Sequence, residues 1–194
     1  MVKISSLTNK KNLTTLLVAV ILASGVLGFA ASAESGMNYP VGSGDDDWWI
    51  AYPDQHPNAG TEVNHPEWIL DAVKDEPIIL LIHMTNCPAC EIQEENINTV
   101  LDDMDDDIGY HEMLTENYDD IYDLLDIYDP SGRPITHSRY EVPATVFFTL
   151  VPDAEGNVHV GWYSYTNYRS EDHIRAYAED AIDYYQENSD NWDE

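Results

Sequence analysis

The sequence predicts an α/β domain in which a mixed sheet of four to five strands carries helices on both faces. Three observations lead to this prediction. The apolar run at residues 78–82 is typical of a strand that is buried on both faces. Apolar residues at helical spacing follow it, and a turn at residues 153–157 joins two later strands before a last amphipathic helix. A β-α-β unit followed by a β-β-α unit forms such a sheet.

A short helix is expected to open the domain. Asn64 and Glu67 have the spacing of a capping box, and Pro66 is tolerated in a first helical turn. These residues predict a helix that ends at about Lys74.

The remaining elements follow from apolar spacing and from turn residues. They are a helix from the cysteines to about Met104, a strand near 108–114, a helix at 118–128, a polar loop at 129–138, a strand at 142–148, a strand at 158–163 and a helix capped by Ser170.

The charge excludes several classes of protein. The 194 residues include 8 Lys and Arg against 37 Asp and Glu, a formal net charge of −29. So negative a surface repels phosphate backbones, which excludes nucleic acid as an expected partner, and it repels anionic lipid headgroups as well. Because 43% of the residues are hydrophobic, the chain has enough core-forming material to fold, unlike a disordered acidic tail.

Residues 1–33 have the pattern of a signal peptide. Lysines precede an uncharged apolar stretch, and the small residues 31–33 resemble a cleavage site. The alternative is a membrane anchor, formed by residues 13–32, that stays attached. Both interpretations predict an extracytoplasmic protein, secreted or anchored.

The rest of the chain divides into an acidic linker or arm at 34–63, a folded domain at 64–188 and an acidic tail at 189–194. The tandem tryptophans Trp48 and Trp49 are expected to cover an apolar edge of the domain, and contact with substrate is the alternative. Acids occur in every part while lysine almost vanishes, as in haloadapted proteins, where dense carboxylates keep a chain soluble in salt. An acidic docking face for a cationic partner is the other interpretation.

The two cysteines, Cys87 and Cys90, are too few and too close together for a disulfide framework. An apolar strand leads into the pair and a helix follows it. Val142 and Pro143 stand at the head of a later core strand. These features resemble the thioredoxin superfamily over roughly residues 66–188, and specifically an extracytoplasmic thioredoxin-like protein of a haloadapted archaeon.

The resemblance implies a thioredoxin fold and a role for each of these residues. Cys87, at the positive end of a helix dipole, would be the attacking thiolate, and Cys90 would resolve the mixed disulfide by forming the redox disulfide Cys87–Cys90. Pro143 would be a cis-proline, with Val142 and Pro143 docking the substrate. The alternatives are a structural disulfide and a trans proline that begins an edge strand.

The chain also departs from the family pattern. Leu81 replaces the buried acid six positions before the first cysteine, and Asn86 stands where a tryptophan is common. His83, on the same side of the strand as Leu81, is a candidate auxiliary base, and simple packing in the core is its alternative. The loop at 129–138 has the character of an insertion.

No metal or cofactor is expected. The acidic run at 102–107 fails the EF-hand template, because Ile108 falls where the turn glycine belongs. His56, His65 and Glu67 match no metal-site spacing.

The sequence therefore predicts an extracytoplasmic thiol–disulfide oxidoreductase that acts as a monomer. Its expected partners are cysteine-containing exported proteins and a membrane thiol donor or acceptor, and the direction of electron flow stays open. One alternative is a Cu(I) metallochaperone that uses both thiolates with His83 or Met84. The other is a non-catalytic interaction module with a fixed disulfide.

Overall fold

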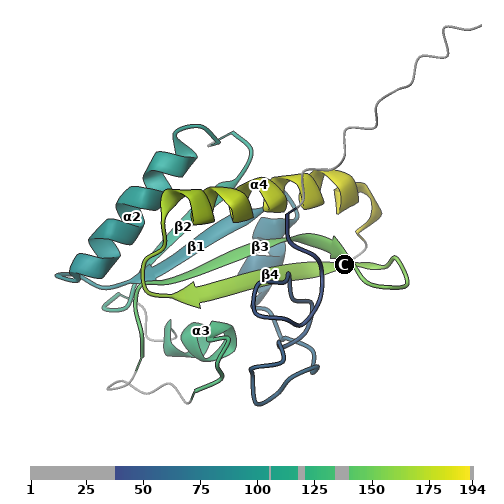
Figure 1. The fold of residues 1–194 in the computed structure, drawn as a ribbon, viewed down its shortest axis with the longest axis horizontal. Helices are drawn as coiled ribbons and strands as arrows, with labels where there is room; N and C mark the ends of the chain where they lie inside the picture. The colour runs from purple at the N-terminus through teal and green to yellow at the C-terminus, as the bar shows by residue number, and fades with distance from the viewer. Residues whose placement is uncertain (1–37, 105, 118–120, 134–139, 193–194) are drawn as a thin grey trace, which may run out of the picture. The chain divides into compact units, whose positions relative to one another are not determined.

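Four strands form one mixed sheet in the order β2-β1-β3-β4 (Figure 1). The central strand β1 (Ile78–His83) pairs in parallel with β2 (Gly109–Leu114) and antiparallel with β3 (Ala144–Pro152). The fourth strand, β4 (Val158–Thr166), pairs antiparallel with β3. The structure is a computed structural model that describes residues 38–104, 106–117, 121–133 and 140–192.

Helices cover both faces of the sheet. The helices α2 (Pro88–Leu101) and α4 (Glu171–Asn188) lie together on one face, and α3 (Ile121–Tyr128) lies on the other (Figure 1). A short helix α1 (Glu67–Val73) precedes β1, and a 3-10 turn η1 (Ser189–Asn191) follows α4. The predicted α/β class is confirmed, and the order and pairing of the strands are those of a thioredoxin fold.

The predicted cap of the first helix is wrong. Pro66 occupies the N-cap position, with φ −58° and ψ 142°. No side chain makes a capping hydrogen bond to the first turn of the helix. A residue that precedes proline is pushed out of the helical region. His65 therefore stays outside the helix, and Asn64 and Glu67 cannot form a capping box.

The boundaries of three other elements also differ from the predictions. The helix α2 ends at Leu101 rather than near Met104, and its last turn contains no basic residue that could stabilise the helix terminus. The strands β3 and β4 are each nine residues long, because their antiparallel pairing is continuous from Ala144–Thr166 to Pro152–Val158. The predicted signal peptide, residues 118–120 of the predicted helix and residues 134–138 of the predicted loop lie outside the described residues.

The alternation of side chains along the strands decides which residues face α2. Phe147 in β3 packs against Tyr177 of α4, so its pairing partner Ile79 faces the same side of the sheet. Residues at every second position of β1 share this face. Leu81 and His83 therefore point toward the layer that contains α2.

An N-terminal arm at residues 38–63 packs against the sheet edge formed by β4. Trp48 and Trp49 are buried, and Trp49 exchanges two backbone hydrogen bonds of 2.9 Å with Trp162 of β4. The arm thereby occupies hydrogen-bonding groups of an edge strand that would otherwise stay open to another chain. Among the described residues, no helix has the length and apolar character needed to cross a membrane.

Hydrogen bonds to a buried carboxylate hold the start of this arm against α4. Asp180 of α4 accepts hydrogen bonds from the backbone N–H groups of Asn38 (2.6 Å) and Tyr39 (2.9 Å). Burial raises the pKa of Asp180 above its usual value. No local pattern in the sequence distinguishes this residue from the other acids of the chain.

Candidate active site

The cysteine pair lies where the central strand passes into α2. The chain leaves β1 at His83, turns through residues 84–86 and enters α2 at Pro88. Asn86 makes the turn with φ +56°, a left-handed conformation that Asn adopts more readily than most residues. The sharp turn places Cys87 at the helix N-terminus.

A carboxylate from the neighbouring strand end holds this turn. Glu116, just beyond β2, accepts hydrogen bonds from the backbone N–H of Thr85 (2.9 Å) and from its hydroxyl (2.6 Å). These hydrogen bonds lower the pKa of the exposed Glu116 carboxyl to about 2. The turn before the cysteines is therefore tied to the end of β2.

Cys87 and Cys90 are joined by a disulfide in the structure. Cys87 caps α2, and its Sγ lies 3.2 Å from the backbone nitrogen of Cys90, whose N–H points to it. Cys87 is half-buried, whereas Cys90 is only 1% exposed. The arrangement leaves one sulfur within reach of a partner and keeps the other inside.

Val142 and Pro143 lie at the same end of the sheet as the cysteines. The peptide bond between them is cis. Because Ala144 pairs with Ile82, the segment before β3 sits beside the end of β1, where the turn to Cys87 begins. Pro143 is buried and Val142 half-buried, and the Pro143 carbonyl accepts a hydrogen bond of 2.8 Å from the Asn167 N–H.

His83 is buried beneath α2, and its Nε2 lies 2.6 Å from Oε1 of Glu112 on β2. Glu112 is the parallel pairing partner of Leu81. The face of the sheet on which Leu81 lies therefore has a carboxylate one strand away. Sequence reasoning found His83 but missed Glu112, because only the register of β1 and β2 brings the two together.

Gln93 is a second polar residue that the sequence analysis missed. It is fully buried on α2, and its Nε2 donates hydrogen bonds to Thr145 Oγ1 (3.0 Å) and to the Tyr165 hydroxyl (2.9 Å). Its Oε1 accepts a hydrogen bond of 2.8 Å from the backbone N–H of Arg169. This network ties the active-site helix to β3, β4 and the start of α4.

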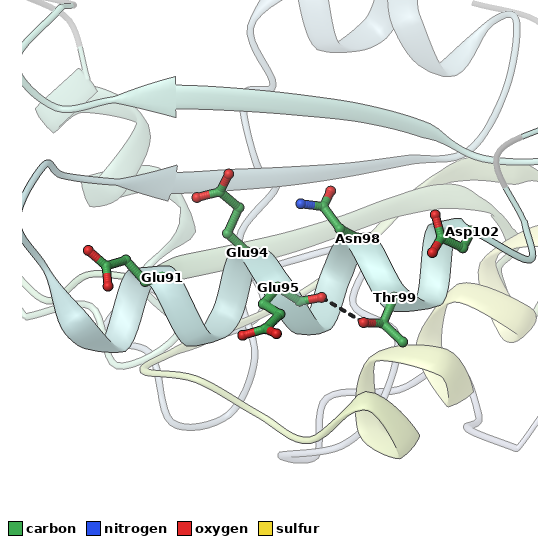
Figure 2. Close-up of a pocket in the computed structure, with 6 residues that line it drawn as sticks. All are labelled: Glu91, Glu94, Glu95, Asn98, Thr99 and Asp102. Atoms are coloured by element: carbon green, nitrogen blue, oxygen red, sulfur yellow. Dashed lines mark hydrogen bonds between the residues drawn. The ribbon is translucent and has the colours of Figure 1, made fainter.

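The outer side of α2 lines a groove of about 370 Å³ (Figure 2). Its walls carry four carboxylates, and the lining residues are Glu91, Glu94, Glu95, Asn98, Thr99 and Asp102. Ligand atoms of His83, Glu94 and Glu112 all lie within 4.8 Å of one another, so within the described part of the chain this group could hold a metal.

The other histidines considered from the sequence are placed elsewhere. His56 stacks on Tyr52 with ring centroids 4.1 Å apart, and His65 Nδ1 lies 2.9 Å from the Tyr128 hydroxyl. Burial lowers the pKa of His65 to about 4. Both are packed side chains with aromatic neighbours.

No protein-family model matches the chain, and no curated protein matches it. Among solved structures, the chain is similar to chloroplastic thioredoxin z, with 15% sequence identity and a TM-score of 0.42 over 59% of this chain and 88% of that chain. So distant a likeness says nothing about activity. The thioredoxin-like fold and the close Cys87–Cys90 pair together support a redox role.

Proposed function

We propose that the chain is an extracytoplasmic thiol–disulfide oxidoreductase that exchanges disulfides with exported proteins. The observation that carries the proposal is the placement of the cysteines at the N-terminus of α2, with Cys87 half-buried and Cys90 buried behind it. The positive end of a helix dipole and free N–H groups stabilise a thiolate at such a position. The Cys90 N–H, which points at Cys87 Sγ, is one of these groups.

The reduction of a substrate would take two exchange steps. The Cys87 thiolate attacks one sulfur of a substrate disulfide, forms a mixed disulfide and releases the first substrate thiolate. The Cys90 thiol then loses its proton and attacks Cys87 Sγ, which closes the Cys87–Cys90 disulfide and releases the second substrate thiolate. The pair gives up two electrons, and the reverse sequence oxidises a substrate dithiol.

Val142 and Pro143 are the proposed docking element for the substrate. They lie beside the end of β1, next to the turn that leads to Cys87. An extended substrate segment could pair with backbone groups there, as in other complexes that add a strand to a sheet edge. A membrane thiol donor or acceptor would reset the redox state of the pair between turnovers.

The auxiliary base is proposed to be His83 acting with Glu112. The pair lies on the face of the sheet below α2, where the family's acid is missing at Leu81. In this role the imidazole would take up the Cys90 proton during resolution.

Replacement of each cysteine by serine tests the proposal. Cys87→Ser should abolish insulin reduction and disulfide formation, because the attacking sulfur is gone. Cys90→Ser should trap mixed disulfides with a cysteine-containing substrate, which are visible by non-reducing electrophoresis. Ala89→Ser, between the two cysteines, is the matched control and should keep most of the activity. Retained thiol exchange in the Cys87→Ser protein would refute the proposal.

A further inference from the structure

A polar cluster with unusual hydrogen bonding lies between α2 and the sheet. It consists of His83 at the end of β1, Glu112 on β2 and Glu94 on α2. One nitrogen and two carboxylate oxygens from these residues all lie within 4.8 Å of one another. The cluster contains no sulfur and is distinct from the cysteine pair.

The fold brings the three residues together from separate elements. Glu112 pairs with Leu81 and lies on the same face as His83, two residues further along β1. Figure 2 shows the Glu94 side chain leaving α2 on the side of the strands, whereas Glu95 points away from them. Glu94 is half-buried, and the Glu112 side chain is 42% exposed. The cluster is therefore buried at His83 and accessible to solvent at Glu94 and Glu112.

His83 is the buried member of the cluster. The residue is 6% exposed, and its Nε2 makes no hydrogen bond, while Glu112 Oε1 lies 2.6 Å away as its ion-pair neighbour. Tyr110, two residues before Glu112 on the same face of β2, also has a buried hydroxyl without a partner. Buried polar atoms are nearly always paired, so a buried imidazole nitrogen that makes no hydrogen bond and lies beside two carboxylates is available as a ligand atom.

We infer that His83, Glu94 and Glu112 bind a divalent cation of the zinc class. An imidazole and two carboxylates are ligands that such borderline ions accept, whereas Cu(I) prefers sulfur. Zinc holds nitrogen and oxygen ligands at about 2.0–2.2 Å, so a tetrahedral site needs its ligand atoms about 3.3 Å apart. The distance of 2.6 Å between His83 Nε2 and Glu112 Oε1 has to widen to about this value when the ion binds. Three protein ligands leave a fourth position for water. A bound cation occupies the imidazole nitrogen that the proposed base role uses, so His83 acts as a base only in the metal-free protein.

Charge and access agree with this assignment. With a neutral imidazole the cluster carries two negative charges, which a divalent cation balances. Among the described residues, the arginine ion pairs lie elsewhere, with Arg133 on Asp129 and Glu141 and Arg175 on Asp103. The acidic groove along α2 shares Glu94 with the cluster and gives an ion a path from solvent (Figure 2).

Zinc titration of the full chain tests the inference. The protein is kept in the disulfide form, so that no thiolate can bind metal, and is titrated with zinc chloride in a calorimeter. We expect one zinc ion per chain. His83→Asn and Glu112→Gln should each weaken binding at least about tenfold, since even the loss of outer-shell partners costs about 10- to 100-fold. Co²⁺ should give the visible absorption of a four- or five-coordinate site in the wild-type protein but not in the His83→Asn and Glu112→Gln variants.

The control variants separate a built site from a generally acidic surface. Glu91→Gln and Glu95→Gln each remove one negative charge from the same helix without removing a ligand, and should change zinc affinity by less than about twofold in molar salt. Because the Glu112 side chain is partly exposed, its replacement leaves no cavity in the hydrophobic core. Far-UV circular dichroism verifies that the Glu112→Gln protein is folded. Equal weakening by the control and ligand variants, or no binding at millimolar zinc, would overturn the inference.

Discussion

Gln93 and Glu94 leave the same helix one position apart and enter two different environments. Gln93 turns toward β3 and β4, where Thr145, Tyr165 and the Arg169 backbone satisfy its amide. Glu94 turns toward β1 and β2, where the nearby atoms are a second carboxylate and a histidine nitrogen without a hydrogen-bond partner. One side of α2 is a closed polar network and the other is an incomplete one.

The difference separates structural polar residues from functional ones. A buried network in which each member is paired fixes the position of the helix and with it the cysteines. A cluster with orphan atoms lowers stability unless something else binds there. We therefore assign the positioning of α2 to the Gln93 network, and ligand binding to the cluster that contains Glu94.

Replacement of Gln93 should have the largest effect on stability. Gln93→Leu keeps the size of the side chain but leaves the buried Thr145 and Tyr165 hydroxyls without their amide donor. We expect a loss of about 2–6 kcal/mol in the free energy of unfolding, from about 1–3 kcal/mol for each of the two unsatisfied buried hydroxyls. Urea unfolding in molar salt measures it.

The neighbouring residue provides the matched control. Glu94→Gln removes a charge that faces another carboxylate, so the free energy of unfolding should stay within about 0.5 kcal/mol of wild type or rise. If the two variants lost the same stability, the contrast between the two sides of α2 would be wrong.

His65 extends the comparison to the opposite face of the sheet. It is a half-buried histidine with a partner, the Tyr128 hydroxyl, and desolvation lowers its pKa to about 4. Between its unfolded pKa of about 6.5 and this value, the unfolded chain binds the proton and the folded chain does not, so stability falls as pH falls. We expect His65 to account for a loss of about 2 kcal/mol between pH 7 and pH 5.

The variant His65→Asn isolates this contribution. Its amide can meet the Tyr128 hydroxyl as the ring nitrogen does, but it does not titrate. Urea unfolding at both pH values should therefore show a smaller loss in the variant than in the wild-type protein. Identical pH dependence in the two proteins would show that His65 titrates normally in the folded state.

The sequence predicted best where one local signal was sufficient. The apolar run of β1 and the Ser170 cap of α4 are in the structure as expected, and the Ser170 side chain accepts a hydrogen bond from the His173 N–H. The helix beginning at the cysteines was also correct. In each case the pattern and the tertiary environment favour the same conformation.

The sequence did not predict polar residues whose role depends on contacts between elements that are distant in the chain. Asp180 lies on the stripe of α4 that faces the arm, and nothing local distinguishes it from the many exposed acids of this chain. Glu112 and Glu94 are hidden among those acids for the same reason. Only the parallel register of β1 and β2, together with the placement of α2, identifies them.

The reduction potential of the Cys87–Cys90 pair tests the central claim most directly. The full chain is equilibrated in molar salt with glutathione and dithiothreitol buffers, and the dithiol fraction is measured by alkylation. A redox-active pair should titrate reversibly in a single two-electron step above about −300 mV. A disulfide that remains closed well below about −300 mV, as structural disulfides typically do, would contradict the proposed function.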